Sequence, residues 1–124
     1  MALEAADNSH GVCSLGPLIH NRLAVDDLLK SGIRSCDAIS GIKKNEKVII
    51  RSHGVAPDIM KRLTSQNYDV IDATCPHVRR AQRYVEKLAS EGYHVVIVGE
   101  KDHPEVKGLL GYAGKNASIY SQNQ

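Results

Sequence analysis

Hydrophobic residues fall in short runs separated by amphipathic stretches. Apolar runs of strand length recur at residues 12–15, 33–36, 47–50, 69–71, 94–98 and 117–120. Between them, apolar positions recur every three or four residues, which predicts helices. Strands that alternate with helices indicate βαβ units. We therefore expect a single α/β domain over residues 1–124, with four or five strands in one mostly parallel sheet and helices on both faces, in three layers.

Local signals mark where the predicted helices begin and end. Three helices begin at a proline that follows a turn, namely Pro57, Pro76 and Pro104. Proline suits the first turn of a helix because it lacks the N–H group that would be unpaired there. An earlier helix carries its apolar residues on one face and should end before Gly32. Those apolar residues are Ala24, Val25, Leu28 and Leu29.

The composition supports this fold and excludes several classes of protein. Hydrophobic residues make up 42% of the chain, but Phe and Trp are absent, so small aliphatic residues must build the core, as in buried parallel sheets. A net charge of +2 without long Lys/Arg runs disfavours a nucleic-acid partner. No apolar run is long enough to span a membrane. The three cysteines lack C-x-x-C spacing, which argues against a secreted disulfide framework and favours the cytoplasm.

The stretch V-I-D-A-T-C-P-H-V-R-R at residues 70–80 carries a cysteine directly before a predicted helix. Cys75 precedes Pro76, so we expect it at the helix N-terminus, where N–H groups and the helix dipole favour a thiolate. The alternative is a small buried residue, which is what most free cysteines are. Cys13 and Cys36 lie within predicted strands, and we expect both in the core rather than as ligands.

Several chemically active residues follow predicted strands. Ligands of open parallel sheets bind beyond the carboxyl ends of the strands, and the turns expected there carry His20, His53, Cys75, His103 and Glu105. Helix N-termini bind anions, and imidazoles donate hydrogen bonds to phosphate. The arrangement predicts a site for a diphosphate or a similar polyanion.

Each of these residues also has a plainer interpretation. His53 suits a turn, His20 can help to cap a helix, and Glu105 can complement a helix dipole. We favour the shared site because these residues fall at one predicted edge. The remaining histidines lack this placement and are expected to be structural or at the surface, namely His10, His77 and His94.

Four motifs together resemble a known family. They are G-P-L-I-H-N at residues 16–21, R-S-H-G-V at 51–55, D-A-T-C-P at 72–76 and H-P-E-V at 103–106. In order and spacing they are similar to the N-terminal part of the LytB/IspH reductases. The resemblance implies an oxidoreductase of the non-mevalonate isoprenoid pathway. It would reductively dehydroxylate 4-hydroxy-3-methylbut-2-enyl diphosphate to isopentenyl and dimethylallyl diphosphates.

The resemblance also implies roles for individual residues. The family has a three-lobed α/β fold around a 4Fe-4S cluster held by three cysteines, and Cys75 matches one of them. His20, His53 and His103 match the histidines around the substrate diphosphate. Glu105 matches the acidic residue that delivers a proton as the hydroxyl leaves as water. A ferredoxin- or flavodoxin-type donor is expected to supply the electrons.

The chain departs from the family pattern at both ends. The family opens with a G-F-C-x-G-V turn that carries the first cluster cysteine, and Cys13 does not replace it because it lies in the next strand. The sequence reaches Gln124 before the region of the third cysteine. We therefore expect an incomplete N-terminal lobe with little or no turnover alone.

Two alternatives stay open. One is a non-catalytic phosphate- or diphosphate-binding module in which Cys75 is a spectator. The other is a lobe that pairs with a second chain carrying the missing cysteines.

Overall fold

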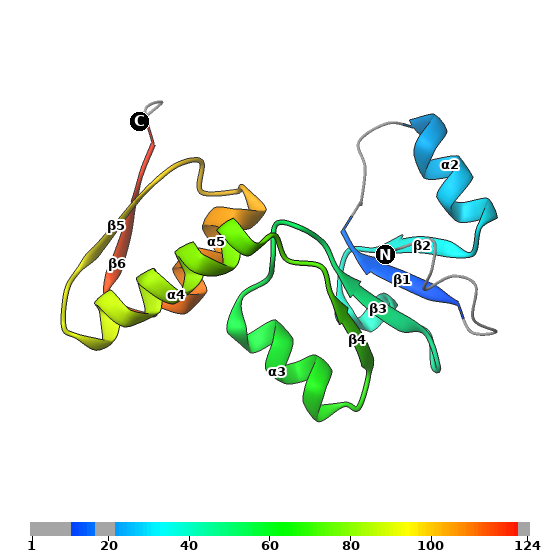
Figure 1. The fold of residues 1–124 in the computed structure, drawn as a ribbon, viewed down its shortest axis with the longest axis horizontal. Helices are drawn as coiled ribbons and strands as arrows, with labels where there is room; N and C mark the ends of the chain where they lie inside the picture. The colour runs from blue at the N-terminus through cyan, green and yellow to red at the C-terminus, as the bar shows by residue number, and fades with distance from the viewer. Residues whose placement is uncertain (1–10, 17–21, 122–124) are drawn as a thin grey trace. The chain divides into compact units, whose positions relative to one another are not determined.

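The computed structural model describes residues 11–16 and 22–121, and its contacts divide the chain into two compact units. The first unit consists of residues 1–51 and 62–73, and the second of residues 52–61 and 74–124. Each unit is described by itself, and the single domain over residues 1–124 stays a prediction. Figure 1 shows the elements of both units.

A four-stranded parallel sheet forms the first unit, with strand order β2-β1-β3-β4. The strands are β1 (Val12–Leu15), β2 (Ile33–Cys36), β3 (Lys47–Ile50) and β4 (Asp69–Asp72). Between them along the chain lie α2 (Arg22–Lys30), the short 3-10 helix η1 (Ile39–Gly41) and α3 (Pro57–Ser65), which continues into the second unit. This confirms the α/β class and the mostly parallel sheet.

Aliphatic residues of the central strands form the core of this sheet. Val12, Ile33 and Ile49 pack together, with Ile71 and Ala73 against them. Because β1 and β3 lie inside the sheet, residues on both of their faces are buried, which matches their mostly apolar sequences.

The second unit contains α4 (Pro76–Ser90), β5 (Val95–Val98), α5 (Pro104–Ala113) and β6 (Ala117–Tyr120). Its two strands pair in parallel with each other and not with the four-stranded sheet. The expected sheet of four or five strands is thus the four-stranded sheet of the first unit, and β5 and β6 form a separate pair. Val85 of α4 and Val106 of α5 pack against Val95 and Ile97 of β5.

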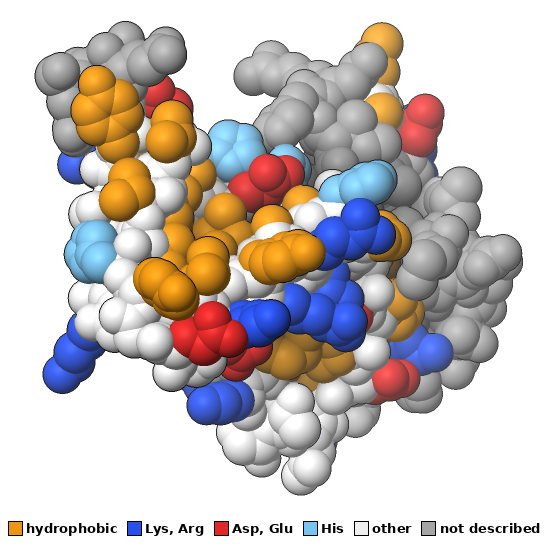
Figure 2. Space-filling view, turned by 60° about the vertical axis from the view of Figure 1, so that its left-hand side comes forward, with side chains coloured by type: hydrophobic (Ala, Val, Ile, Leu, Met, Phe, Trp, Pro, Cys, Tyr) orange, Lys and Arg blue, Asp and Glu red, His pale blue; other side chains and the backbone are white. Residues whose placement is uncertain are grey.

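Only one face of the β5–β6 pair is covered by the described residues. Burial alternates along β5, so Val96 and Val98 point away from the helices and are exposed, as is Tyr120 of β6. Leu88 and Tyr84 of α4 are exposed as well. Figure 2 shows hydrophobic side chains that reach the surface in this way.

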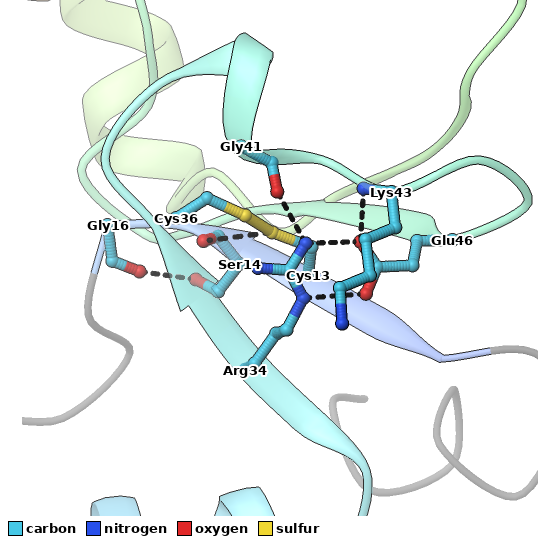
Figure 3. The surroundings of a disulfide bond; sticks show 8 residues. All are labelled: Cys13, Ser14, Gly16, Arg34, Cys36, Gly41, Lys43 and Glu46. Atoms are coloured by element: carbon cyan, nitrogen blue, oxygen red, sulfur yellow. Dashed lines mark hydrogen bonds and ion pairs between the residues drawn. A yellow bond between two sulfur atoms is a disulfide. The ribbon is translucent and has the colours of Figure 1, made fainter.

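Cys13 of β1 and Cys36 of β2 are joined by a disulfide, shown in Figure 3. Both residues are buried, as expected for core positions, but no sequence pattern predicted that they pair. The parallel register sets Cys13 opposite Arg34, two residues before Cys36. The Cα atoms are 6.4 Å apart, within the range that a disulfide spans.

An ion pair fastens the loop before β3 to β2. Arg34 donates hydrogen bonds of 2.7 Å from Nε and Nη2 to the two carboxylate oxygens of Glu46, and it also donates to the carbonyl of Gly41 (Figure 3). The backbone N–H of Lys43 donates to the same carboxylate. Glu46 is only 9% exposed, so these bonds replace the water that the carboxylate loses. They lower the pKa of Glu46 below its ordinary value, and burial opposes this effect.

No helix of residues 22–121 is long and apolar enough to cross a membrane.

The Arg34–Glu46 pair predicts how stability depends on pH. Because folding lowers the pKa of Glu46, the ionised carboxylate stabilises the fold above the unfolded value of 4.5, and this is lost as the pH falls through the folded value. We expect Glu46→Gln to lower the free energy of unfolding by about 1–2 kcal/mol at pH 7, and by less at pH 3. Urea unfolding at both pH values measures the difference.

The matched control is Glu86→Gln, an exposed glutamate of α4 that loses the same charge. It should change stability by less than about 0.5 kcal/mol. Equal effects of the two substitutions at pH 7 would show that the ion pair contributes nothing specific.

Candidate functional site

Three turns of the second unit carry the predicted site residues. His53 lies between β3 and α3, Cys75 directly before α4, and His103 directly before α5. The backbone N–H of Cys75 donates a 3.0 Å hydrogen bond to the carbonyl of Ser52. This bond joins the turn of Cys75 to the turn of His53.

Cys75 is the N-cap residue of α4, as predicted, and Pro76 follows at the start of the helix. Its side chain makes no capping hydrogen bond, and its thiol is half-buried and outside any disulfide. The carbonyl of Cys75 accepts a 3.0 Å bond from Arg79 in the first turn of the helix. The sulfur is therefore held at a helix N-terminus by its backbone alone.

His103 caps α5 through its ring. Its Nδ1 atom accepts a 3.2 Å hydrogen bond from the backbone N–H of Glu105. An accepting Nδ1 carries no hydrogen, so the geometry assigns the ring hydrogen to Nε2 in the neutral imidazole. The exposed ring therefore presents an N–H donor on the side away from the helix.

His53 and His103 lie against each other. Their ring centroids are 5.6 Å apart, and the planes meet at 75°, an edge-to-face arrangement. Glu105 is half-buried on the first turn of α5, next to this pair. Two imidazoles and the backbone N–H of Glu105 thus lie close together at the start of α5.

Gln82 of α4 is a residue that the sequence reasoning missed. It is buried, and a Cβ atom placed on Gly54 would lie 2.6 Å from its Nε2 atom. Gly54 has a φ of +73°, which residues other than glycine rarely adopt. One signal could have found it: Gln82 stands four residues after Val78 and three before Val85, a spacing that places all three on one face of a helix.

The structure thus brings four of the predicted residues into one unit. His53 contacts His103, Glu105 follows on the same helix, and Cys75 lies on a hydrogen-bonded neighbouring turn. His20 lies outside the described residues. Among the other histidines, His77 is exposed and His94 contacts Ser118 Oγ at 3.0 Å, away from these turns, while His10 is not described.

A separate cavity of about 800 Å³ lies in the first unit, at the amino ends of β3 and β4. Asn45 and Asn67 line it, and both have positive φ, which asparagine tolerates in turns. None of the predicted site residues lines this cavity. Glu46, the buried polar residue of its lining, is already bonded to Arg34 and Lys43, so nothing in this cavity points to a ligand.

No group of three or more His, Cys, Asp or Glu residues within residues 11–16 and 22–121 is arranged to hold a metal ion. Cys75 is the one cysteine outside a disulfide in this part of the chain. It cannot hold an iron–sulfur cluster by itself, since such clusters need several protein ligands.

Comparison with known proteins points to one family. The sequence model of the LytB protein family matches residues 1–124. The 4-hydroxy-3-methylbut-2-enyl diphosphate reductase of Campylobacter fetus is 41% identical over 119 residues, covering 95% of this chain and 43% of the relative. That of Campylobacter hominis is 45% identical over 113 residues, covering 90% and 41%.

Solved structures agree with the sequence relatives. A structure of (E)-4-hydroxy-3-methyl-but-2-enyl diphosphate reductase superposes with a TM-score of 0.81 at 39% identity, covering 95% of this chain and 44% of that one. The corresponding reductase from Plasmodium falciparum gives 0.86 at 26% identity, covering 96% and 39%. The chain therefore spans less than half the length of the relatives it matches.

The cysteine arrangement predicts a thiol count. Iodoacetamide added in denaturant without reductant should modify one cysteine, Cys75, and prior reduction should raise the count to all three. Mass spectrometry of tryptic peptides identifies the modified residues. The Cys75→Ser variant should take up no label before reduction. Label on Cys13 or Cys36 without reductant would show that the disulfide is absent.

Proposed function

Because the chain belongs to the LytB protein family, we propose that it supplies part of the active site of a 4-hydroxy-3-methylbut-2-enyl diphosphate reductase. The observation that carries the proposal is the contact between His53 and His103, with Glu105 in the first turn of the helix that His103 caps. The substrate named for the relatives ends in a diphosphate, and donors of this kind suit that anion.

In this proposal the two histidines bind the diphosphate. The hydrogen bond from Glu105 N–H holds the His103 ring and leaves Nε2–H as a donor. The edge-to-face contact fixes the His53 ring beside it. His20 is proposed as the third histidine of the same site on the strength of its motif alone.

Glu105 is proposed as the proton donor. Reductive dehydroxylation breaks the bond between the allylic carbon and its hydroxyl oxygen, takes up two electrons and two protons, and releases water. A protonated carboxyl next to the diphosphate site could give one proton to the departing oxygen. The half-buried position of Glu105 on the first turn of α5 is compatible with this role.

Cys75 is proposed as one ligand of the family's 4Fe-4S cluster. The sulfur of Cys75 is half-buried, forms no disulfide and lies at a helix N-terminus, which suits thiolate ligation. The other ligands would have to come from polypeptide outside the described residues. When bound, the cluster would supply electrons to the substrate, received from a ferredoxin- or flavodoxin-type donor.

A cytoplasmic setting belongs to the same proposal. In a reducing compartment Cys13 and Cys36 would stand as two buried thiols in neighbouring strands instead of a disulfide. The proposed chemistry uses neither residue.

A second candidate is a phosphate- or diphosphate-binding module without catalysis. It is favoured by one observation: the described residues present anion donors but only one thiolate. The two candidate functions differ in whether cluster binding and turnover need Cys75, and a substitution of this residue separates them.

That experiment uses a chimera of the Campylobacter fetus reductase in which this chain replaces the matching 119 residues. We expect the chimera to bind iron and sulfide stoichiometrically and to oxidise reduced methyl viologen in the presence of substrate. Cys75→Ser should abolish both, because a cluster ligand is lost. Iron quantitation and the viologen assay measure these outcomes.

The control in the chimera is Cys36→Ser, which removes a sulfur from the core of the other unit. It should retain the cluster. A chimera that keeps its cluster and turnover with Cys75→Ser would favour the non-catalytic interpretation of this cysteine.

The diphosphate site can be tested on the 124-residue chain. We expect inorganic diphosphate to bind, and His103→Gln to weaken binding about tenfold, the loss of one hydrogen bond to a charged group. Isothermal titration calorimetry gives the dissociation constants. The control is His94→Gln, whose ring contacts Ser118 outside the three turns. Equal weakening by both substitutions would place the bound anion elsewhere.

A further inference from the structure

Gln82 is a buried polar residue without an evident structural task. Its side chain is 4% exposed, and its Nε2 atom is buried without a hydrogen-bond partner among the described residues. Interior amides normally pair both of their polar groups, because an unmade hydrogen bond is costly. The residue therefore calls for an explanation other than packing.

The surroundings of Gln82 connect it to the site. Its amide lies beside Gly54, the residue after His53, and a Cβ atom on Gly108 of α5 would lie 3.5 Å from the same nitrogen. The side chain of Thr74, which precedes Cys75, lies against Gly54 as well. The carboxamide thus occupies the space between the turn of His53 and the helix that His103 caps.

We propose that Gln82 is a positioning residue for His53. Its carboxamide sets how closely the His53–Gly54 turn approaches α5, and so it fixes the His53 ring against His103. The inference deepens the proposed function, because it rests on these two histidines forming the diphosphate site. Gln82 itself does not touch the ligand in this account, since its nitrogen is buried.

An apolar residue would do better if packing alone were needed. A methionine has nearly the same length and volume, lacks the unpaired amide hydrogens, and would continue the apolar stripe of Val78 and Val85. Removing a buried donor that has no partner is neutral or stabilising. A positioning role therefore predicts opposite effects of Gln82→Met on stability and on diphosphate binding.

The experiment compares the unmodified chain with Gln82→Met. We expect the urea midpoint to stay equal or rise, while the dissociation constant for inorganic diphosphate increases about fivefold, because the displaced His53 ring then makes a weaker hydrogen bond to the anion. In the ligand-free chain, the imidazole carbon–proton NMR signals of His53 and His103 should move, and that of His94 should not. Assignment uses the His53→Gln and His103→Gln variants.

The matched control is Gln66→Met, an exposed glutamine after α3 that should alter neither the binding constant nor these signals. Unchanged His53 signals with unchanged diphosphate binding in Gln82→Met would overturn the inference. If Gln82→Met does not fold, the inference is overturned as well, because a positioning role requires the fold to stay intact when the amide is removed.

The two proposals fail separately. If the unmodified chain binds no diphosphate, the proposed function is wrong for this site, and the His53 and His103 signals of Gln82→Met still decide the positioning role. A second variant, Gly54→Ala, introduces a Cβ atom 2.6 Å from Gln82 Nε2, too close to be accommodated without a shift, and should move the same signals. Combining it with Gln82→Ala, which removes the obstacle, should bring them part of the way back.

Discussion

The turn after β3 can reach its position only because Gly54 has no side chain. Its positive φ excludes most residues, and the space where a Cβ atom would stand is filled by Gln82. His53, the residue before Gly54, contacts His103. In the proposed account, two residues without reactive groups therefore set the geometry of the pair that carries the chemistry.

Local signals were enough to predict most elements. Pro57, Pro76 and Pro104 each begin a helix where expected, and the φ of Gly32 is left-handed just beyond α2. The partner of each strand was harder to predict, because pairing depends on contacts distant in sequence. Val95–Val98 is apolar at every position, which is typical of a strand buried on both faces, yet its alternate residues are exposed. Nothing in those four residues distinguishes a central strand from one half of an isolated pair.

The candidate site divides in the same way between local and distant information. Cys75 at a helix N-terminus and His103 before Pro104 follow from neighbouring residues, and the structure agrees. The contact between His103 and His53 joins positions 50 residues apart, which no local pattern specifies. Gln82 was missed because glutamine in a helix usually faces water. The roles of these residues in catalysis remain proposals.

The uncovered face of β5 and β6 has a thermodynamic consequence. Val96, Val98 and Tyr120 are already hydrated in the folded chain, so unfolding exposes less new apolar surface there than in a sheet covered on both sides. Heat capacity change and denaturant sensitivity both scale with that newly exposed surface. Per residue, the free energy of unfolding of the second unit should accordingly change less with temperature than that of the four-stranded sheet.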